Sequence, residues 1–170
     1  MMTIKEIDLK PNPNYIGKKL WGKRLKSMIN KIIVHQELGE ANTIAVHNYH
    51  ISKESHLKLG TGAPRIAYHF TIEKDGTIYR VNDETDIVWH TAGQNMSGIG
   101  VMLVGDFSGK GHVGKSEPTD EQLESLEWLL DKLSTDLKVS KSEIYGHEDF
   151  GKPACPGYKV MEFIKEYRSA

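Results

Sequence analysis

The single cysteine of this 170-residue chain lies in a segment that also holds a histidine. The segment, residues 146–157, reads GHEDFGKPACPG and places His147 eight residues before Cys155. Imidazole nitrogen and thiolate sulfur are the ligands that zinc prefers in proteins. His35 ends a short apolar run and offers a third ligand, and three protein ligands would leave one coordination position open for chemistry. These residue types indicate a catalytic metal site.

Two other interpretations of Cys155 stay open on the spacing alone. A cysteine close to a histidine can act as a thiol nucleophile. A lone cysteine can also be a small buried hydrophobic residue with no chemistry of its own. No sequence rule brings His35 near the other two residues. The choice between a metal ligand, a nucleophile and a buried residue therefore depends on the surrounding motifs.

Hydrophobic periodicity and turn signals predict the elements that must position these residues. Apolar runs predict strands over residues 31–35, 86–90, 99–104 and 143–145. Asp75-Gly76 predicts a hairpin between residues 66–73 and 77–81. Helices are predicted over residues 42–53, 119–137 and 160–167, the second with a capping box of Thr119 and Gln122. Strands mixed with helices predict an α/β (mixed α+β) fold, in which helices flank one central mixed β-sheet.

Composition and charge narrow the class of protein. With 38% hydrophobic and 26% charged residues, the chain is typical of one globular domain. No stretch approaches the roughly 18 apolar residues of a membrane helix, so membrane insertion is not expected. The first residues hold no apolar secretion signal, so we expect synthesis in the cytoplasm.

The positive charge of the chain gathers near its start. Residues 1–31 carry eight Lys or Arg against two carboxylates, a net charge of +6, which leaves −7 for the remainder. No aromatic residues of the base-stacking kind interleave these cations, so nucleic-acid binding is not predicted. We expect a solvated surface segment, with an anionic wall polymer as the alternative partner.

Each motif alone is a weak signal, but the order of the motifs along the chain is specific. The chain reads IIVHQ, a helix with histidines, GAPRIAYHFTIEKDGTIYRV, VWHTAGQN, SGIGVMLVGDF, PTDEQLESLEWLL and IYGHEDFGKPACPG. This ordered set resembles the zinc-dependent N-acetylmuramoyl-L-alanine amidases, the type 2 family that includes phage lysins and peptidoglycan recognition proteins. The resemblance implies a single catalytic domain over residues 1–170, with a basic N-terminal segment (1–30), a family core (31–158) and a C-terminal helix (159–170).

The resemblance also implies roles for individual residues. His35, His147 and Cys155 match the three zinc ligands, so Zn²⁺ is the implied cofactor. Tyr68 in AYHF matches a tyrosine that family members place beside the reacting water, where a phenol can hydrogen-bond the water or the oxyanion. Substrate-groove roles are implied for two further residues, His90 in WHTAG and Asn95 in the polar loop after it.

Helix and strand geometry separate the other histidines. His50 shares a helix face with His47 and is the better groove candidate of the two. His69 directly follows Tyr68, so in a strand it points to the opposite side and is expected in the core. Trp89 is an aromatic candidate for stacking on sugar or peptide. Two histidines in polar segments are expected to face solvent: His56 and His112.

The chain departs from the family pattern at two places. Many phage members have a lysine two residues before the third ligand, aimed at the developing oxyanion. Here that position is Pro153, which has no donor, and the lysine is Lys152, one residue earlier. Lys152 either reaches the oxyanion from its shifted position or is a solvated loop lysine. The other departure is Gln36-Glu37 after His35, where relatives often have His-Thr, and we expect it to affect the groove rim more than the metal.

The implied function is metal-assisted hydrolysis of the amide between N-acetylmuramic acid and L-alanine in peptidoglycan. Peptidoglycan is the expected partner, and a monomer is expected. Two alternatives stay open: a peptidoglycan-binding module without catalysis, and a cysteine hydrolase that uses Cys155 and His147. A phage or prophage lysin that reaches the cell wall after release fits the sequence, and so does a cytoplasmic amidase that recycles muropeptides.

Overall fold

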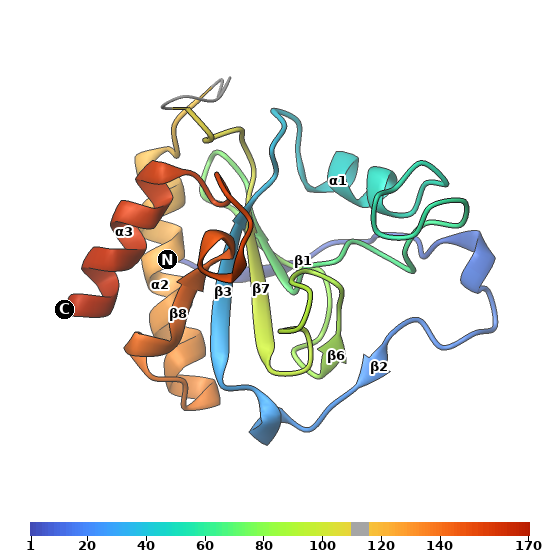
Figure 1. Ribbon diagram of the computed structural model, residues 1–170, viewed down its shortest axis with the longest axis horizontal. Helices are drawn as coiled ribbons and strands as arrows, with labels where there is room; N and C mark the ends of the chain where they lie inside the picture. Colours follow the sequence, from blue (N-terminus) through green and yellow to red (C-terminus); the bar gives the residue numbers. More distant parts are fainter. Residues whose placement is uncertain (110–115) are drawn as a thin grey trace.

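The computed structural model describes residues 1–109 and 116–170, and a six-stranded mixed β-sheet forms its centre (Figure 1). The strands are β1 (Ile4–Glu6), β3 (Lys31–Gln36), β4 (Phe70–Ile72), β5 (Ile78–Arg80), β7 (Gly98–Leu103) and β8 (Ile144–Gly146). Their order across the sheet is β1, β5, β4, β7, β3, β8. The β4–β5 hairpin pairs antiparallel, and the other described pairs of this sheet are parallel. The predicted fold class is confirmed.

The two longest strands lie side by side in the middle of the sheet. β3 and β7 pair in parallel from Lys31 opposite Gly98 to Gln36 opposite Leu103. Nearly all their residues are buried, as continuous apolar runs predict for strands covered on both faces. β8 pairs in parallel with the other side of β3, with Val34 opposite Gly146. Because the three strands run the same way, they end at one edge of the sheet.

Helices and loops cover both faces of this sheet (Figure 1). α2 (Asp120–Leu137) and α3 (Tyr158–Ser169) lie on one face, where Leu126 and Leu130 of α2 join a core with Ile32 and Val34 of β3. α1 (Thr43–His50) lies on the other face, where a second core contains Val46 and residues of β7 and the N-terminal segment. None of the helices in residues 1–109 and 116–170 has the length and apolar character needed to cross a membrane.

The helix predicted over residues 42–53 ends three residues early. Asn42 caps its start by accepting a hydrogen bond from the Ala45 N–H. At the other end, the His50 carbonyl accepts from the Ala63 N–H, and the Ile51 carbonyl accepts from a buried asparagine, Asn12. These distant donors replace the helical partners, so the helix stops.

The strand predicted over residues 86–90 is also shorter than expected. It forms over β6 (Asp86–Ile87) and pairs with β2 (Gly22–Lys23) in a separate two-stranded sheet. Trp89 instead packs edge-on against Trp21, with ring centroids 5.2 Å apart. The residues after β6 therefore leave the strand to reach the site described below.

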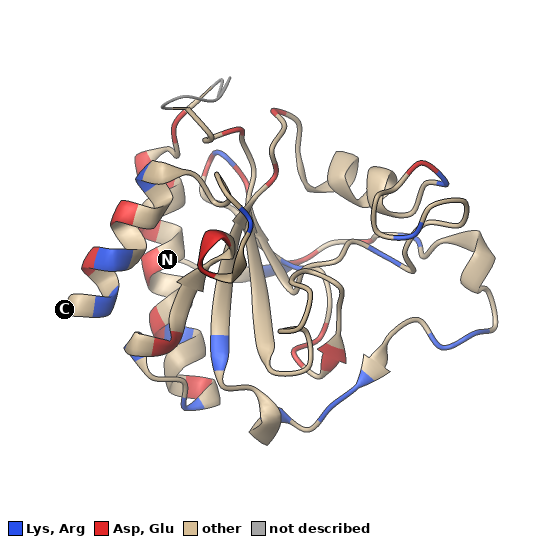
Figure 2. Ribbon diagram, viewed as in Figure 1, with Lys and Arg blue, Asp and Glu red and all other residues tan. Residues whose placement is uncertain are grey.

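The basic N-terminal segment is part of the folded structure. β1 extends the central sheet by parallel pairing with β5, and Arg24 is only 6% exposed. The Arg24 guanidinium donates hydrogen bonds of 2.8–3.0 Å to three main-chain carbonyls, those of Glu84, Asn95 and Gly98. Burial lowers the pKa of Arg24 to about 10, so the group stays charged at neutral pH. Figure 2 shows Lys and Arg along the stretch around β2, whereas Asp and Glu are frequent on α2 and α3.

Replacing Arg24 by Met should lower the free energy of unfolding by about 2–5 kcal/mol, because each buried carbonyl left without a donor costs about 1–3 kcal/mol. Unfolding in urea measures this difference. Lys26→Met removes a charge from an exposed position of the same segment and should change stability by less than about 0.5 kcal/mol. Equal stability of the two variants would contradict a structural role for Arg24.

Candidate metal centre

Parallel pairing of β3 and β8 brings two histidines together at the edge of the sheet. His35 follows Val34 and His147 follows Gly146, and the latter two residues lie opposite each other. The Nδ1 atoms of the histidines are 3.0 Å apart. Cys155 completes a group whose ligand atoms all lie within 4.8 Å of one another. The structure therefore brings together the three residues that the sequence predicted as metal ligands.

The chemistry of this donor set fits zinc. Burial and nearby histidines hold the pKa of His35 well below its usual value, and burial lowers that of His147 to about 4. Both imidazoles are therefore neutral at pH 7, with lone pairs available for a metal. Burial raises the pKa of the Cys155 thiol to about 11, so a bound cation would have to displace the thiol proton. Two neutral imidazoles and one thiol match the preferred ligands of Zn²⁺.

His90 orients the His35 ring through a hydrogen bond to Nε2, the nitrogen that faces away from His147. His90 Nε2 lies 3.2 Å from the Gly98 carbonyl and donates to it, so His90 Nδ1 is an acceptor. His35 Nε2 lies 3.2 Å from that acceptor and donates to it, which leaves the lone pair of His35 on Nδ1, facing His147. Gly100 makes room for this arrangement, since a Cβ there would lie 2.7 Å from His90 Cγ.

A cavity of about 320 Å³ opens beside the three residues. The predicted groove and catalytic residues that line it are His50, Tyr68, Trp89, His90 and Lys152. Of these, His90 is only 6% exposed, so most of its contacts are with the protein. The remaining predicted groove residue, Asn95, does not line this cavity. Its side chain accepts a 2.8 Å hydrogen bond from the Thr91 N–H and closes the turn after His90.

Tyr68 lies between two of the histidines on the cavity wall. Its ring centroid is 5.1 Å from that of His35 and 5.6 Å from that of His50. Burial raises the pKa of Tyr68, so its hydroxyl stays protonated. Within the described part of the chain, no hydrogen bond joins this hydroxyl to another protein group. Tyr68 can therefore donate a hydrogen bond to a molecule in the cavity.

The two histidines of α1 differ in what they offer. His50 Nδ1 accepts a 3.0 Å hydrogen bond from the Ala67 N–H, so its proton lies on Nε2. Burial lowers the pKa of His50 to about 3, which makes it a neutral donor at the cavity. His47 uses both nitrogens within the protein, at the Ile66 N–H and the Lys10 carbonyl, and serves packing.

Lys152 and His56 line the cavity from two separate loops. Lys152 lines the cavity from its shifted position, next to Pro153. Its charge adds to the effect of burial in lowering the pKa values of His147 and His56. His56 is exposed as expected, yet it also lines the cavity, which the sequence analysis missed because a polar loop carries no periodic signal. His112 lies outside the described residues.

Gln36 and Glu37, which depart from the family pattern after His35, have different contacts. Glu37 lines the cavity, and its carboxylate accepts hydrogen bonds from the Ala41 and Gly105 N–H groups. Gln36 is buried and also lines the cavity, and its side chain donates a hydrogen bond to the Ala154 carbonyl in the loop that carries Cys155. The expected effect on the groove rim did not include this contact.

Comparison with known proteins identifies the family. The family model described as N-acetylmuramoyl-L-alanine amidase matches residues 25–158. The chain belongs to this family. The endolysin of Enterobacteria phage K11 is 31% identical over 100 residues, and that of Enterobacteria phage T3 is 37% identical over 98 residues. These matches cover 59% and 58% of this chain, and 64% and 63% of the two endolysins, so the chain spans slightly less than two thirds of those relatives.

A solved structure shares the fold over the whole chain. The N-acetylmuramoyl-L-alanine amidase LysC from Clostridium intestinale URNW superposes with a TM-score of 0.72 and is 24% identical. The superposition covers 100% of this chain and 99% of that one. The resemblance predicted from the ordered motifs is thus confirmed at the level of family and fold.

Buried neutral histidines predict that the fold loses stability in acid. His69 is fully buried, accepts from the Gly100 N–H and donates to the Asp86 carbonyl, and burial holds its pKa well below 6.5. Below about pH 6.5 the His69 imidazole binds a proton in the unfolded chain but stays neutral in the folded chain. The free energy of unfolding should therefore fall by up to about 1.4 kcal/mol per pH unit for such a group.

His69→Asn keeps an acceptor for the Gly100 N–H and removes the titrating group. The fall in stability from about pH 6.5 to about pH 4.5 should be shallower than in the native protein, as measured by urea unfolding at each pH. His56→Asn, at an exposed position, should change this slope less. A slope in His69→Asn that equals the native slope would show that His69 titrates normally.

Proposed function

We propose that this protein is a zinc-dependent N-acetylmuramoyl-L-alanine amidase, which hydrolyses the amide between the lactyl group of N-acetylmuramic acid and L-alanine. The proposal is carried by the meeting of His35, His147 and Cys155 beside a cavity, in a chain of this family. These three residues would hold the metal. When bound, zinc supplies a Lewis acid that polarises the scissile carbonyl and lowers the pKa of water.

The remaining residues of the cavity suit the charge changes of amide hydrolysis. One water adds across the bond: the carbonyl carbon becomes a carboxylate, the C–N bond breaks, and the alanine nitrogen leaves as an amine after taking a proton. Negative charge develops on the carbonyl oxygen in the transition state. The protonated hydroxyl of Tyr68 would donate a hydrogen bond to that oxygen. Lys152 would add positive charge at the same cavity.

Other parts of the cavity would hold the substrate in place. The Nε2–H of His50 is a neutral donor of fixed orientation, suited to a sugar or peptide oxygen. Trp89 offers an aromatic surface, braced by its contact with Trp21. His90 acts mainly through His35, since its hydrogen bonds join it to the protein.

We infer further that residues 1–170 act as one catalytic unit on the cell wall. The N-terminal segment contributes β1 to the sheet, and Arg24 bonds the carbonyls of Asn95 and Gly98 beside the loop that holds His90. Similarity to phage endolysins favours intact peptidoglycan over soluble muropeptide as the substrate.

The native protein should bind about one zinc ion per chain, and a strong chelator should abolish cleavage until zinc is restored. Cys155→Ala should lose both metal and activity. Elemental analysis measures the metal, and new L-alanine amino termini measure cleavage, with purified walls compared to soluble muropeptide. Full activity in chelator with loss on alkylation would instead identify a cysteine hydrolase. Muropeptide binding without new amino termini would identify a recognition module.

Tyr68→Phe should lower kcat by about 10²- to 10³-fold, because it removes one hydrogen-bond donor to the developing oxyanion. Zinc content and muropeptide affinity should stay close to native, which separates this effect from damage to the site. Tyr145→Phe is the matched control, since the Tyr145 hydroxyl bonds Glu143 away from the cavity wall. Equal kcat values for the two variants would remove Tyr68 from the mechanism.

A further inference from the structure

We propose that Gln36 positions Cys155 by fastening the main chain just before it to the end of β3. This role rests on the proposed function for the identity of the metal, while the fastening itself concerns the protein alone. Gln36 would be a positioning residue, because its contacts lie with protein groups and its effect on the metal centre passes through Cys155.

Alternation along β3 places Gln36 on the side of the strand opposite to His35. Ile32 and Val34, which share the parity of Gln36, belong to the core beneath α2 and α3. His35, which lies between Val34 and Gln36 in the strand, points to the opposite side and faces the cavity. The last residue of β3 therefore sends its side chain toward the core, and the residue also contributes to the cavity wall.

The Gln36 side chain joins two loops that are far apart in the sequence. Its amide nitrogen donates a hydrogen bond to the carbonyl of Ala154, the residue before Cys155. Its amide oxygen accepts a 2.6 Å hydrogen bond from the N–H of Phe107, which follows β7. With only 3% of its surface exposed, Gln36 makes these bonds away from solvent competition.

The main chain of Gln36 reaches the same loop a second time. Its backbone N–H lies toward Cys155 and lowers the pKa of the thiol, against the larger effect of burial, which raises it. One residue at the end of β3 thus holds the carbonyl before Cys155 with its side chain and acts on the thiol through its main chain. The sheet that fixes His35 is in this way tied directly to the third ligand.

Cys155 needs this support more than the two histidines do. His35 lies within β3, and His147 directly follows β8, whereas Cys155 lies in an irregular segment. Ala154 has a φ of +66°, in the left-handed region that a residue with a Cβ disfavours. An outside bond that holds the Ala154 peptide in this conformation fixes the direction in which the Cys155 side chain leaves the chain.

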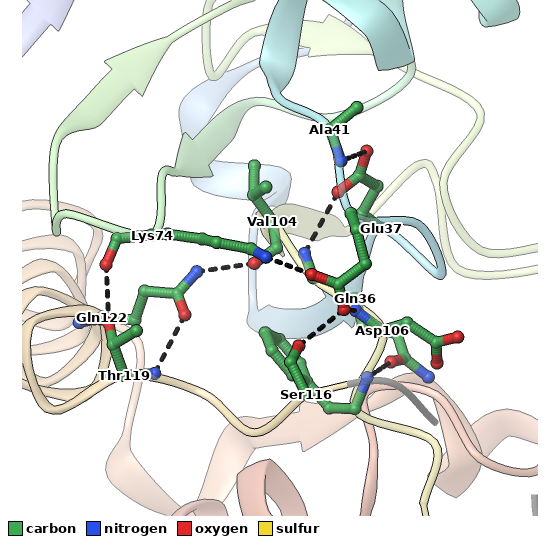
Figure 3. A network of polar contacts seen from close by, with 12 residues as sticks. Gln36, Glu37, Ala41, Lys74, Val104, Asp106, Ser116, Thr119 and Gln122 are labelled. Carbon is green, nitrogen blue, oxygen red and sulfur yellow. Dashed lines mark hydrogen bonds and ion pairs between the residues drawn. The ribbon is translucent and has the colours of Figure 1, made fainter. Parts of the chain in front are cut away.

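A second buried glutamine provides a control within the same protein. Gln122 is fully buried, and its amide bonds the carbonyls of Ile72 and Val104 and the N–H of Thr119. Figure 3 shows Gln36 and Gln122 in one region of polar contacts, each joining separate segments. Gln122 makes none of its side-chain bonds to the Cys155 loop. The two glutamines therefore differ in the contact with the Ala154 carbonyl, on which the proposal rests.

The test compares Gln36→Met with Gln122→Met, both of which remove a buried amide and keep a similar volume. For Gln36→Met, we expect the dissociation constant of Zn²⁺ to rise about 10- to 100-fold, the usual effect of losing a group that orients a ligand. The sulfur-to-metal charge-transfer band of the Co²⁺-substituted protein should weaken or shift. Iodoacetamide should alkylate Cys155 several-fold faster in the metal-free variant than in metal-free native protein. Gln122→Met should match the native protein in all three measurements.

The outcomes separate this proposal from the proposed function. If native protein binds no zinc, the proposed function fails, and the alkylation rates of metal-free protein still test the role of Gln36. A folded Gln36→Met variant with native zinc affinity and native alkylation would overturn the proposal. If Gln36→Met does not fold, Gln36→Glu, which keeps the acceptor for Phe107 and loses the donor to Ala154, replaces it with the same expected results. Equal changes in the Gln122→Met variant would reduce the effect to general loss of stability and would also overturn it.

Discussion

The parallel pairing of β3 with β8 is the constraint on which the candidate metal centre depends. It places Val34 opposite Gly146, so His35 and His147, 112 positions apart in the sequence, emerge together at one edge of the sheet. β7 holds the other side of β3, and both faces are packed. A slip of one residue would move buried side chains to the wrong face, so the core that fixes the register also fixes the distance between the two imidazoles.

Burial has opposite effects on the acids and bases of the site, and both effects favour the neutral form. It lowers the pKa values of the imidazoles of His35 and His147, and it raises those of the Tyr68 hydroxyl and the Cys155 thiol. Two lone pairs and one hydroxyl donor are therefore present at pH 7 without any net charge. A divalent cation would stabilise the thiolate directly, because the sulfur would be its ligand. Tyr68, which is not one of the three ligands, would keep its proton and remain a donor.

The sequence could predict those parts of the structure that local patterns determine. Continuous apolar runs located β3 and β7, and the capping box located the start of α2, because each signal lies within the element itself. The strand β1 was not predicted, since three residues become a strand only by pairing with β5, more than seventy positions away. The buried role of Arg24 was not predicted for a related reason: a polar side chain that bonds distant main-chain groups looks the same in a sequence as a solvated one. The three candidate ligands came from the family resemblance, because their spacing alone left other chemistry open.

The end of β3 explains how one strand can serve the cavity and the core at once. Successive residues of a strand face opposite sides, so His35 turns to the cavity and Gln36 to the interior. The side-chain amide of Gln36 bonds the Ala154 carbonyl and the Phe107 N–H, so a substitution at position 36 alters the support of Cys155. In the segment before Cys155, Lys152, Pro153 and Ala154 all line the cavity, and the Ala154 carbonyl is also held by Gln36. The bond from Gln36 to Ala154 thus ties the direction of the Cys155 side chain to the sheet, while the Lys152 side chain takes no part in that bond.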